Sequence, residues 1–279
     1  MSSALHIFSK RILVDYLIRF IGYLIIFILI SVLIAVLGYI VWNGLKSVTP
    51  LILTQTGNTS SGGLLNAIIG TWLLTGVGLL IALPVGLFGA IFIVEYSTTK
   101  AGNTFKLFTD LLTGIPSIVL GFFGYIMLVI YLNMGYSLLA GGIVLGIMMI
   151  PYVLRISEIS LSNIPKEVRE SAFALGANKM QVILRLLIGQ ARTGILIGST
   201  LAISIAAGET AQLLYTAGWN NAFPTGFVHS PVAYLTYVVW AGINQPSNYA
   251  HGLAFAAAFI LVIMILSLIL ITKYASKNR

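Results

Sequence analysis

Glu209 is the residue with the clearest potential for chemistry, because it is the only carboxylate that falls well inside an apolar segment of the sequence. A helix that enters a membrane at Thr193 would carry Glu209 about 24 Å inward, past the midplane. An ionisable side chain at that depth is costly and marks a functional position by default. Glu209 could act as a gate or balance the charge of an arginine. The alternative is a structural glutamate that is neutral or hydrogen-bonded to Thr210.

The polar segment 163–177 is the second candidate. Pro165 stands where a helix would begin, and Glu167 and Glu170 fall in its first turns, where carboxylates favour the helix dipole. Gly176 would end the helix in the left-handed conformation. The sequence therefore predicts a short helix between two apolar stretches.

This short helix would carry one apolar stripe, because Val168, Ala172 and Leu175 recur at helical spacing. So short a helix is not stable alone. It needs a surface to dock against, which could be another protein, the lipid interface or its own bundle.

The sequence offers few residues for nucleotide binding, catalysis or metal binding. The sequence has no G-x4-G-K-[ST] phosphate-binding motif and no cysteine, and its three histidines, His6, His229 and His251, are far apart. It therefore predicts no catalytic residue, no metal site and no cofactor. ATP, if it drives the system, is expected to be used by another polypeptide.

The composition indicates the class of fold that must position Glu209 and the polar segment 163–177. Of 279 residues, 58% are hydrophobic and only 8% are charged, against roughly a quarter charged in soluble domains. A domain of this size with a water-facing surface cannot use so much apolar area. The sequence predicts an all-α polytopic membrane protein and excludes a soluble enzyme, a nucleic-acid-binding domain and a disordered chain.

Six apolar stretches approach or exceed the length of about 20 residues that crosses a bilayer. They predict six transmembrane helices, near residues 20–42, 67–94, 108–132, 137–156, 193–217 and 250–272. Proline interrupts three of them, and Pro84, Pro116 and Pro151 are each expected to kink or break a helix. The alternative is that they are the ordinary prolines of membrane helices.

The basic residues predict the orientation. The segments between the apolar stretches alternate in charge, and the two alternating sets hold 14 and 1 of the 15 Lys and Arg residues. By the positive-inside rule, both termini and the segments 95–107 and 155–192 are cytoplasmic. The predicted organisation is a cytoplasmic N-terminus (1–19), a first helix with its outer loop (20–66), a membrane domain (67–272, with a long cytoplasmic loop at about 157–192) and a cytoplasmic tail (273–279).

The polar segment also resembles a known family. Glu170-Ser171-Ala172-x3-Gly176, followed after nine residues by Leu186-Leu187-Ile188-Gly189, is similar to the EAA loop of permease subunits of ABC importers. In that family the loop is a coupling helix that inserts into a groove of the ATPase subunit. Ser171 and Gly189 depart from the usual Ala and Pro. The resemblance implies a type I permease fold and assigns ATPase coupling to Glu167, Glu170, Ser171, Ala172 and Gly176.

Three further segments resemble the permeases of phosphate importers, PstA more than PstC. They are Gly208-Glu209-Thr210-Ala211, Gly114-Ile115-Pro116-Ser117 and Gly63-x2-Asn66-Ala67-Ile68-x-Gly70-Thr71. Gln212 stands where that type usually has Pro. The resemblance implies a pathway or gate at Gly208, Glu209 and Thr210 and a helix break at Gly114, Pro116 and Ser117.

The function implied by this resemblance is import of inorganic phosphate through the inner membrane of a prokaryote, with this chain forming half of the pathway. Expected partners are a PstB-like ATPase, a PstC-like second permease, a PstS-like binding protein and membrane lipid, without nucleic acid. The alternatives are a permease for another oxyanion, such as molybdate or sulfate, and an ion-coupled secondary transporter. The residues alone do not separate tetrahedral oxyanions.

We predict that Glu209→Gln abolishes or uncouples uptake without loss of assembly, because the substitution removes the charge and keeps the shape of the side chain. Uptake of labelled phosphate and co-purification of the partner subunits measure the two effects. Normal uptake by the variant would remove Glu209 from the mechanism.

Overall fold

The computed structural model describes residues 2–57, 61–97 and 99–277, with side chains from Asp15 onward except that of Thr99. The side chains of Lys10 and Arg11 and the last two residues of the predicted tail lie outside this part. Within it the chain forms helices joined by loops, and an isolated β-bridge links Gly57 to Gly62.

Short π-helical turns, labelled η, extend three of the helices. In chain order the elements are α1 (Ser2–Ser47), α2 (Pro50–Thr54), α3 (Leu65–Ile91), η1 (Phe92–Tyr96), α4 (Thr99–Gly114), α5 (Ser117–Gly124), η2 (Tyr125–Tyr131), α6 (Leu138–Ser162), α7 (Lys166–Ala174), α8 (Lys179–Gln181), η3 (Val182–Leu187), α9 (Ile188–Ala207), α10 (Ala211–Thr216), α11 (Leu235–Ile243) and α12 (Asn248–Lys277).

Five helices in the described part of the chain are long and apolar enough to cross a membrane. They span Asp15–Ser47, Leu65–Tyr96, Leu138–Ser162, Lys179–Ala207 and Asn248–Lys277. The count reaches the predicted six only if the bent pair α4 and α5–η2 forms one span.

The predicted span over 108–132 is broken at Pro116, where a kink or break was expected. Lys100–Gly114 and Ser117–Tyr131 meet at an angle of 93°. Pro116 has no N–H to donate to the preceding turn, and its ring keeps Ile115 out of the helical conformation. The chain therefore turns a corner at this proline.

The predicted fifth span also differs from the structure. Its helix begins at Lys179 and ends at Ala207, so Glu209 lies just beyond the helix rather than inside it. Pro84 and Pro151 remain inside α3 and α6, which continue past them, because packed neighbours in a membrane protein can accommodate the freed backbone groups. Of the three prolines predicted to kink or break a helix, Pro116 is the one at a helix break.

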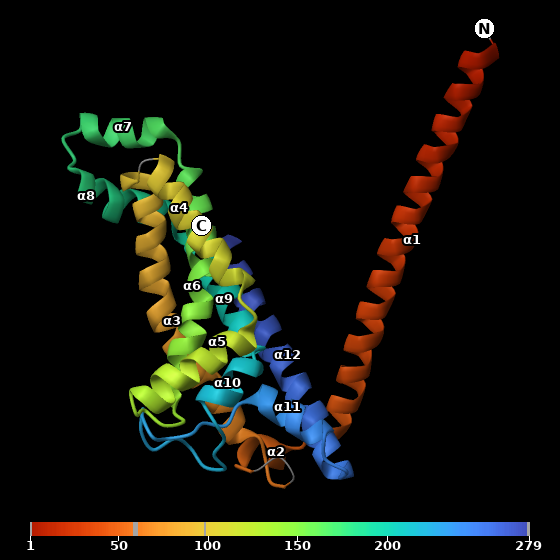
Figure 1. Ribbon diagram of the computed structural model, residues 1–279, viewed down its shortest axis with the longest axis vertical. Helices are drawn as coiled ribbons and strands as arrows, with labels where there is room; N and C mark the ends of the chain where they lie inside the picture. The colour runs from red at the N-terminus through yellow and green to blue at the C-terminus, as the bar shows by residue number, and fades with distance from the viewer. Residues whose placement is uncertain (1, 58–60, 98, 278–279) are drawn as a thin grey trace.

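Figure 1 shows α3, α6 and α9 side by side at the centre of the molecule, with α7 and α8 at one end and α2 and α11 at the other. The most extensive helix contact joins α3 to α6. It is close because a Cβ on Gly146 would lie 3.0 Å from the Gly78 carbonyl oxygen. Small residues on both helices thus bring the two backbones together.

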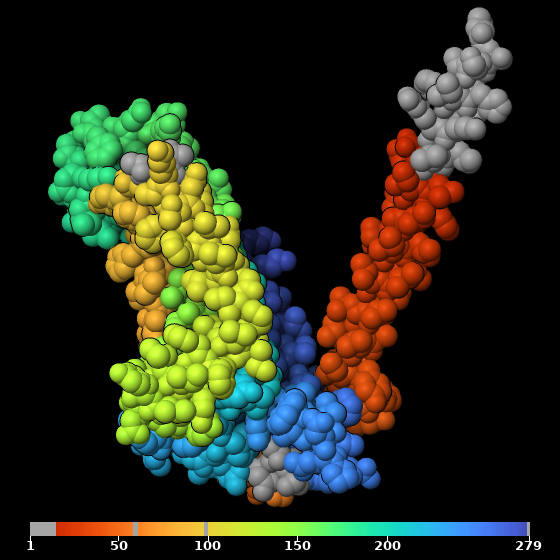
Figure 2. All heavy atoms as spheres, viewed as in Figure 1, coloured from red at the N-terminus to blue at the C-terminus, as the bar shows by residue number. Residues whose placement is uncertain are grey.

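α1 leans away from this bundle (Figures 1 and 2). Within the described residues its main contact is α12, near the α11 end, where the Tyr39 and Phe255 rings lie 5.5 Å apart and Gly44 packs on Phe259. The apolar side chains from Tyr16 to Leu37 are exposed. α1 therefore presents most of its length to lipid or to another protein.

We predict that Gly121→Ala destabilises the permease bundle, because a Cβ at Gly121 would overlap the Cα of Gln212, where α5 crosses α10. The cost is about 1–3 kcal/mol, as for other overpacked cores, and thermal unfolding of the purified chain measures it. The matched control is Gly76→Ala, since a Cβ at Gly76 meets nothing within 4 Å. Equal unfolding temperatures for the two variants would contradict the packing described.

Candidate functional site

The predicted short helix is present as α7, Lys166–Ala174. Pro165 occupies its N-cap position, and Gly176 has φ +84°, the left-handed conformation that ends the helix. The helix stands outside the central bundle at one end of the molecule (Figure 1). Its position and limits confirm the interpretation of the sequence pattern, while its role in ATPase coupling stays a prediction.

The predicted coupling residues Glu167, Glu170 and Ser171 are exposed on α7, whereas Ala172 is partly buried. The Ser171 hydroxyl donates to the Glu167 carbonyl oxygen at 2.7 Å, within the helix itself. A serine at this position therefore keeps its polar group satisfied without needing an external partner. The two carboxylates remain available on the outer surface.

The predicted apolar stripe divides between two surfaces. Val168 and Ala172 pack against the bundle, on a buried cluster that includes Leu161. Leu175 lies past the end of the helix and is 90% exposed, and Phe173 is 47% exposed. The prediction of a single docking stripe is therefore wrong, because the chain turns at Leu175. Two apolar side chains face outward at the tip.

Arg169 holds α7 to two of the membrane-spanning helices. Its Nε lies 3.0 Å from Glu95 Oε1, and both side chains are largely buried. Its other nitrogens donate to the carbonyl oxygens of Leu161 at 2.9 Å and of Ile164 at 2.6 Å. One guanidinium thus joins α7, the end of η1 and the last turn of α6. An arginine suits this position because its donors form a rigid planar fork.

Lys179, at the start of α8, reaches the same place. Its Nζ donates to the Glu95 carbonyl oxygen at 2.7 Å and lies 3.8 Å from the centre of the Tyr96 ring. The segment that carries α7 is therefore fixed to η1 at both of its ends. We call Glu95, Arg169 and Lys179 the η1 anchor.

Two interrupted helices carry the predicted helix break and the predicted pathway residues. The first break, at Gly114 to Ser117, separates α4 from α5. The second, at Gly208 to Thr210, separates α9 from α10. Such discontinuous helices form binding and gating sites in many transporters.

The structure brings the two breaks together. Ser117, at the start of α5, and Thr210 lie beside the carboxylate of Glu209, which is partly buried. Thr236, in the first turn of α11, donates its hydroxyl to the Glu209 carbonyl oxygen at 2.7 Å. Glu209 therefore links three helix ends. Its contact with Ser117 ties it to the α4–α5 corner.

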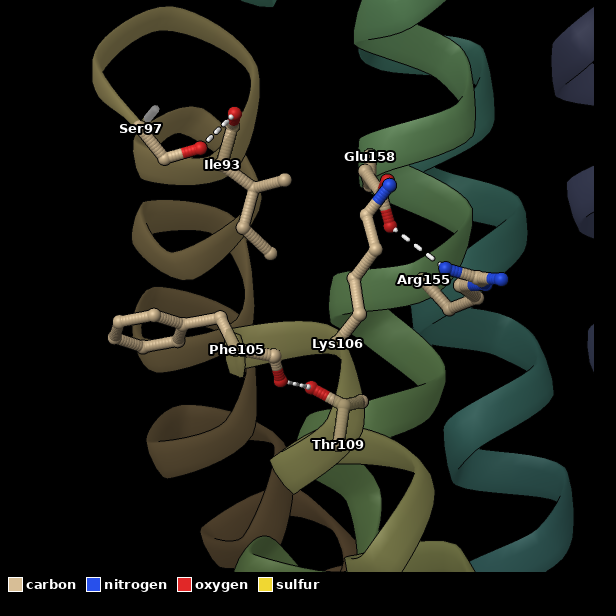
Figure 3. A network of polar contacts seen from close by, with 7 residues as sticks. All are labelled: Ile93, Ser97, Phe105, Lys106, Thr109, Arg155 and Glu158. Carbon is tan, nitrogen blue, oxygen red and sulfur yellow. Dashed lines mark hydrogen bonds and ion pairs between the residues drawn. The ribbon is translucent and has the colours of Figure 1, made fainter. Parts of the chain in front are cut away.

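A second carboxylate, Glu158, lies within α6 and was not singled out by the sequence. Its side chain is 7% exposed, with Lys106 Nζ at 2.7 Å and Arg155 NH1 at 3.1 Å. Figure 3 shows Lys106 reaching from α4 to Glu158, while Arg155 approaches from one turn earlier on α6. Arg155 is thus more than an orientation signal, because it neutralises a buried charge together with Lys106.

A cleft of about 580 Å³ opens between these two groups of charges. Its lining includes Lys106 and Glu158 on one side and Glu95, Arg169 and Glu170 on the other. The cleft separates α4 from α7, so movement of α7 relative to α4 would change its width.

The motif residue Asn66 organises the opposite end of the molecule. Its buried side chain donates to the carbonyl oxygens of Gly57, Asn220 and Asn221 at 3.0–3.2 Å. Nearby, Thr71 Oγ1 accepts from the Leu235 backbone N–H at 3.0 Å. These bonds hold the long loop before α11 against α3.

Among the described residues, no three His, Cys, Asp or Glu side chains are grouped to hold a metal ion. Residues 82–278 match the family described as binding-protein-dependent transport system inner membrane component. The chain belongs to this family.

Curated relatives of this permease carry phosphate-transport names. The phosphate transport system permease protein PstA 2 of Mycobacterium bovis is 42% identical over 80% of this chain and 74% of its own length. The probable PstA of Methanocaldococcus jannaschii is 33% identical over 80% and 79% of the two chains, and the PstA of Haemophilus influenzae is 31% identical over 88% and 87%.

Solved structures confirm the fold of the permease. An inward-facing MetNI methionine ABC transporter matches with a TM-score of 0.58 and 18% identity, over 77% of this chain and 94% of the other. An amino acid ABC transporter matches with a TM-score of 0.58 and 21% identity, over 77% and 93%. These matches show the all-α fold of an ABC importer permease. The family match adds that the chain is an inner-membrane protein.

In the sequence, Arg169, Lys106 and Arg155 are recognisable only as charges that orient the permease. Arg169 stands one residue before the coupling motif, and this position is the feature of the sequence that could have indicated its role. Nothing in the sequence indicated that Lys106 would meet Glu158, because 52 residues and the α4–α5 corner separate them.

We predict that Arg169→Met loosens α7 while the membrane-spanning helices stay folded. The variant loses an ion pair and two hydrogen bonds to carbonyl groups, which destabilises the docked helix by about 2 kcal/mol. Amide hydrogen exchange in α7 should accelerate by more than tenfold, and exchange in α6 should change little. Lys166→Met, at an exposed position of the same helix, is the control. Equal exchange in both variants would show that the η1 anchor does not hold α7.

Proposed function

We propose that the chain is a PstA-type permease of an ATP-driven importer of inorganic phosphate and forms half of its translocation pathway. The names and extent of the curated relatives support the substrate. Membership of the binding-protein-dependent family supports import with a separate binding protein. The alternatives of another oxyanion or of ion-coupled transport have no comparable support.

The observation that carries this proposal is the pair of exposed apolar side chains Phe173 and Leu175 at the tip of α7. Apolar residues on a small helix that projects from the bundle suit insertion into a groove of another protein. We assign this groove to a PstB-like ATPase. The chain has no phosphate-binding loop of its own, so ATP hydrolysis is assigned to that partner, and the permease is non-catalytic.

The path from ATPase to gate follows from the contacts already described. Displacement of α7 acts through the η1 anchor on α3–η1 and α6. α6 bears on α4 through the ion pair between Glu158 and Lys106, and the α4–α5 corner meets Glu209 through Ser117. Each step is a direct contact between packed elements, which is the physical requirement for coupling between distant sites.

The orientation proposed for the permease places α7 and both termini in the cytoplasm. The distribution of Lys and Arg supports it, and the first residues of α1 lie toward the same end of the molecule as α7 (Figure 1). The loops around α2 and before α11 then face outward, where a PstS-like binding protein would deliver phosphate. A PstC-like permease would supply the second half of the pathway.

Weak binding along the pathway fits this arrangement. The pathway residues Glu209 and Thr210, together with Ser117 at the facing helix break, offer a carboxylate and hydroxyl groups but no cation. A phosphate anion would therefore pass without being trapped, and selection would rest with the binding protein. The carboxylate of Glu209 would act as a gate, since repulsion of an anion is relieved when the helix ends move apart.

We predict that replacing Phe173 and Leu175 together by serine abolishes ATP-dependent phosphate uptake. Both side chains are exposed, so the fold should be unchanged while the apolar contact with the ATPase is lost. Uptake of labelled phosphate is measured in vesicles that contain the chain with its ATPase, second permease and binding protein. Ala174→Ser, at the neighbouring exposed position, is the control and should retain uptake.

The same assay tests the whole proposal. Wild-type uptake that does not require ATP would contradict an ABC importer. ATP-dependent uptake of molybdate or sulfate in place of phosphate would contradict only the substrate. Full uptake by the double variant would contradict the role of the α7 tip.

A further inference from the structure

A surface groove of about 340 Å³ runs between α9 and α12, on a part of the permease that neither the η1 anchor nor the Glu209 contacts involve. The two helices pack against each other (Figure 1). On α9 the groove extends from Ile197 to Ser204, which is a length of about 10 Å along the helix. On α12 it extends from Ile269 to Ser276.

The hydroxyl groups in this groove are already satisfied within the protein. Thr200 Oγ1 bonds to the Leu196 carbonyl oxygen at 2.9 Å and to Thr272 Oγ1 at 2.7 Å. Ser204 and Ser276 each donate to a carbonyl oxygen of their own helix at 2.8 Å. The groove therefore presents methyl and methylene groups, so its occupant along this length must be apolar.

One end of the groove is positively charged. Lys273 lines it and is exposed, and Lys277 lies one turn further along α12. Arg192 lies on α9 at the corresponding end and is also exposed. No Asp or Glu occurs from Lys179 to Gly208 or after Glu209, so α9 and α12 supply no acid to neutralise these cations. The occupant must carry negative charge at this end.

The same end of α12 has the features of a membrane interface. Tyr274, beside Lys273, is 71% exposed, and tyrosine and lysine are typical of helix positions at the level of the lipid headgroups. A molecule in the groove thus has its charged end at the headgroup level and its apolar part in the hydrocarbon region.

We propose that this groove binds an anionic phospholipid, with the first part of one acyl chain between α9 and α12 and the phosphate at Lys273. Basic pockets between membrane helices are known to take anionic headgroups in this manner. A helix of another protein fits less well, because it is about 10–12 Å wide with its side chains. It would also have to bring its own carboxylate to Lys273.

The first test measures lipid binding to the purified full-length chain by native mass spectrometry, with phosphatidylglycerol and phosphatidylcholine of identical acyl chains. We expect phosphatidylglycerol to be retained roughly fivefold better, which corresponds to one lysine near an anionic headgroup. Lys273→Gln should remove this preference. Lys100→Gln, which removes an exposed lysine on α4 away from the groove, should keep it.

A groove-filling variant tests the acyl-chain site. Ser204→Phe should lower retention of both lipids, because the ring occupies the apolar channel. Equal retention of the two lipids by the wild-type chain would overturn the proposal, and so would a preference that survives in Lys273→Gln. Undiminished lipid retention in a folded Ser204→Phe variant would overturn the assigned position.

The second test uses a photoreactive phosphatidylglycerol in membranes that contain the chain with its transport partners. We expect the lipid to label peptides that contain 197–204 and 269–276. Crosslinking of these segments to another polypeptide, without lipid labelling, would overturn the proposal. Neither test requires transport, so a failure here and a failure of the phosphate uptake assay are separate results.

Discussion

Lipid provides no hydrogen-bond partner for the peptide groups that a broken helix leaves free, so a membrane protein can interrupt a helix only where the protein itself covers the break. Both breaks in this permease obey that constraint by lying against each other. Ser117 and Thr210 meet the carboxylate of Glu209, and Thr236 meets its carbonyl oxygen. Thr71 accepts the backbone N–H of Leu235 in the same way at the start of α11. Glu209 therefore brings both helix breaks and the first turn of α11 together.

At the other end of the bundle, two ion pairs join different helices. The buried carboxylates of Glu95 and Glu158 each meet a cation from a different helix, Arg169 and Lys106 respectively. Taking such groups out of water is costly unless they are paired. Because the partners lie on separate elements, each pair also constrains the distance between those elements. The two pairs flank one cleft, and together they connect the projecting helix α7 to the corner at Pro116.

Much of this architecture follows from the sequence, because the signals are local. Pro165 and Gly176 mark the limits of α7, and apolar length marks five of the spans. The angle at Pro116 could not be predicted, since a membrane proline is compatible with a continuous helix, as Pro84 and Pro151 demonstrate. The division of the apolar stripe at Leu175 could not be predicted either, because it depends on the residue at which the helix ends. The ion pairs of Arg169 and Lys106 could not be predicted either. Their partners, Glu95 and Glu158, are far away in the sequence, and no local pattern of residues indicates such a pairing.

The isolation of α1 has a consequence for biosynthesis. α1 leaves the ribosome well before α12, which is its main contact in the described chain. During translation α1 must therefore persist in the bilayer as an independent helix, supported by its apolar length alone. The interval before its contact can form is the time needed to synthesise every element between α1 and α12. A stop codon before α12 would leave α1 inserted but without that contact, so the association of the two helices reports that synthesis has passed α12.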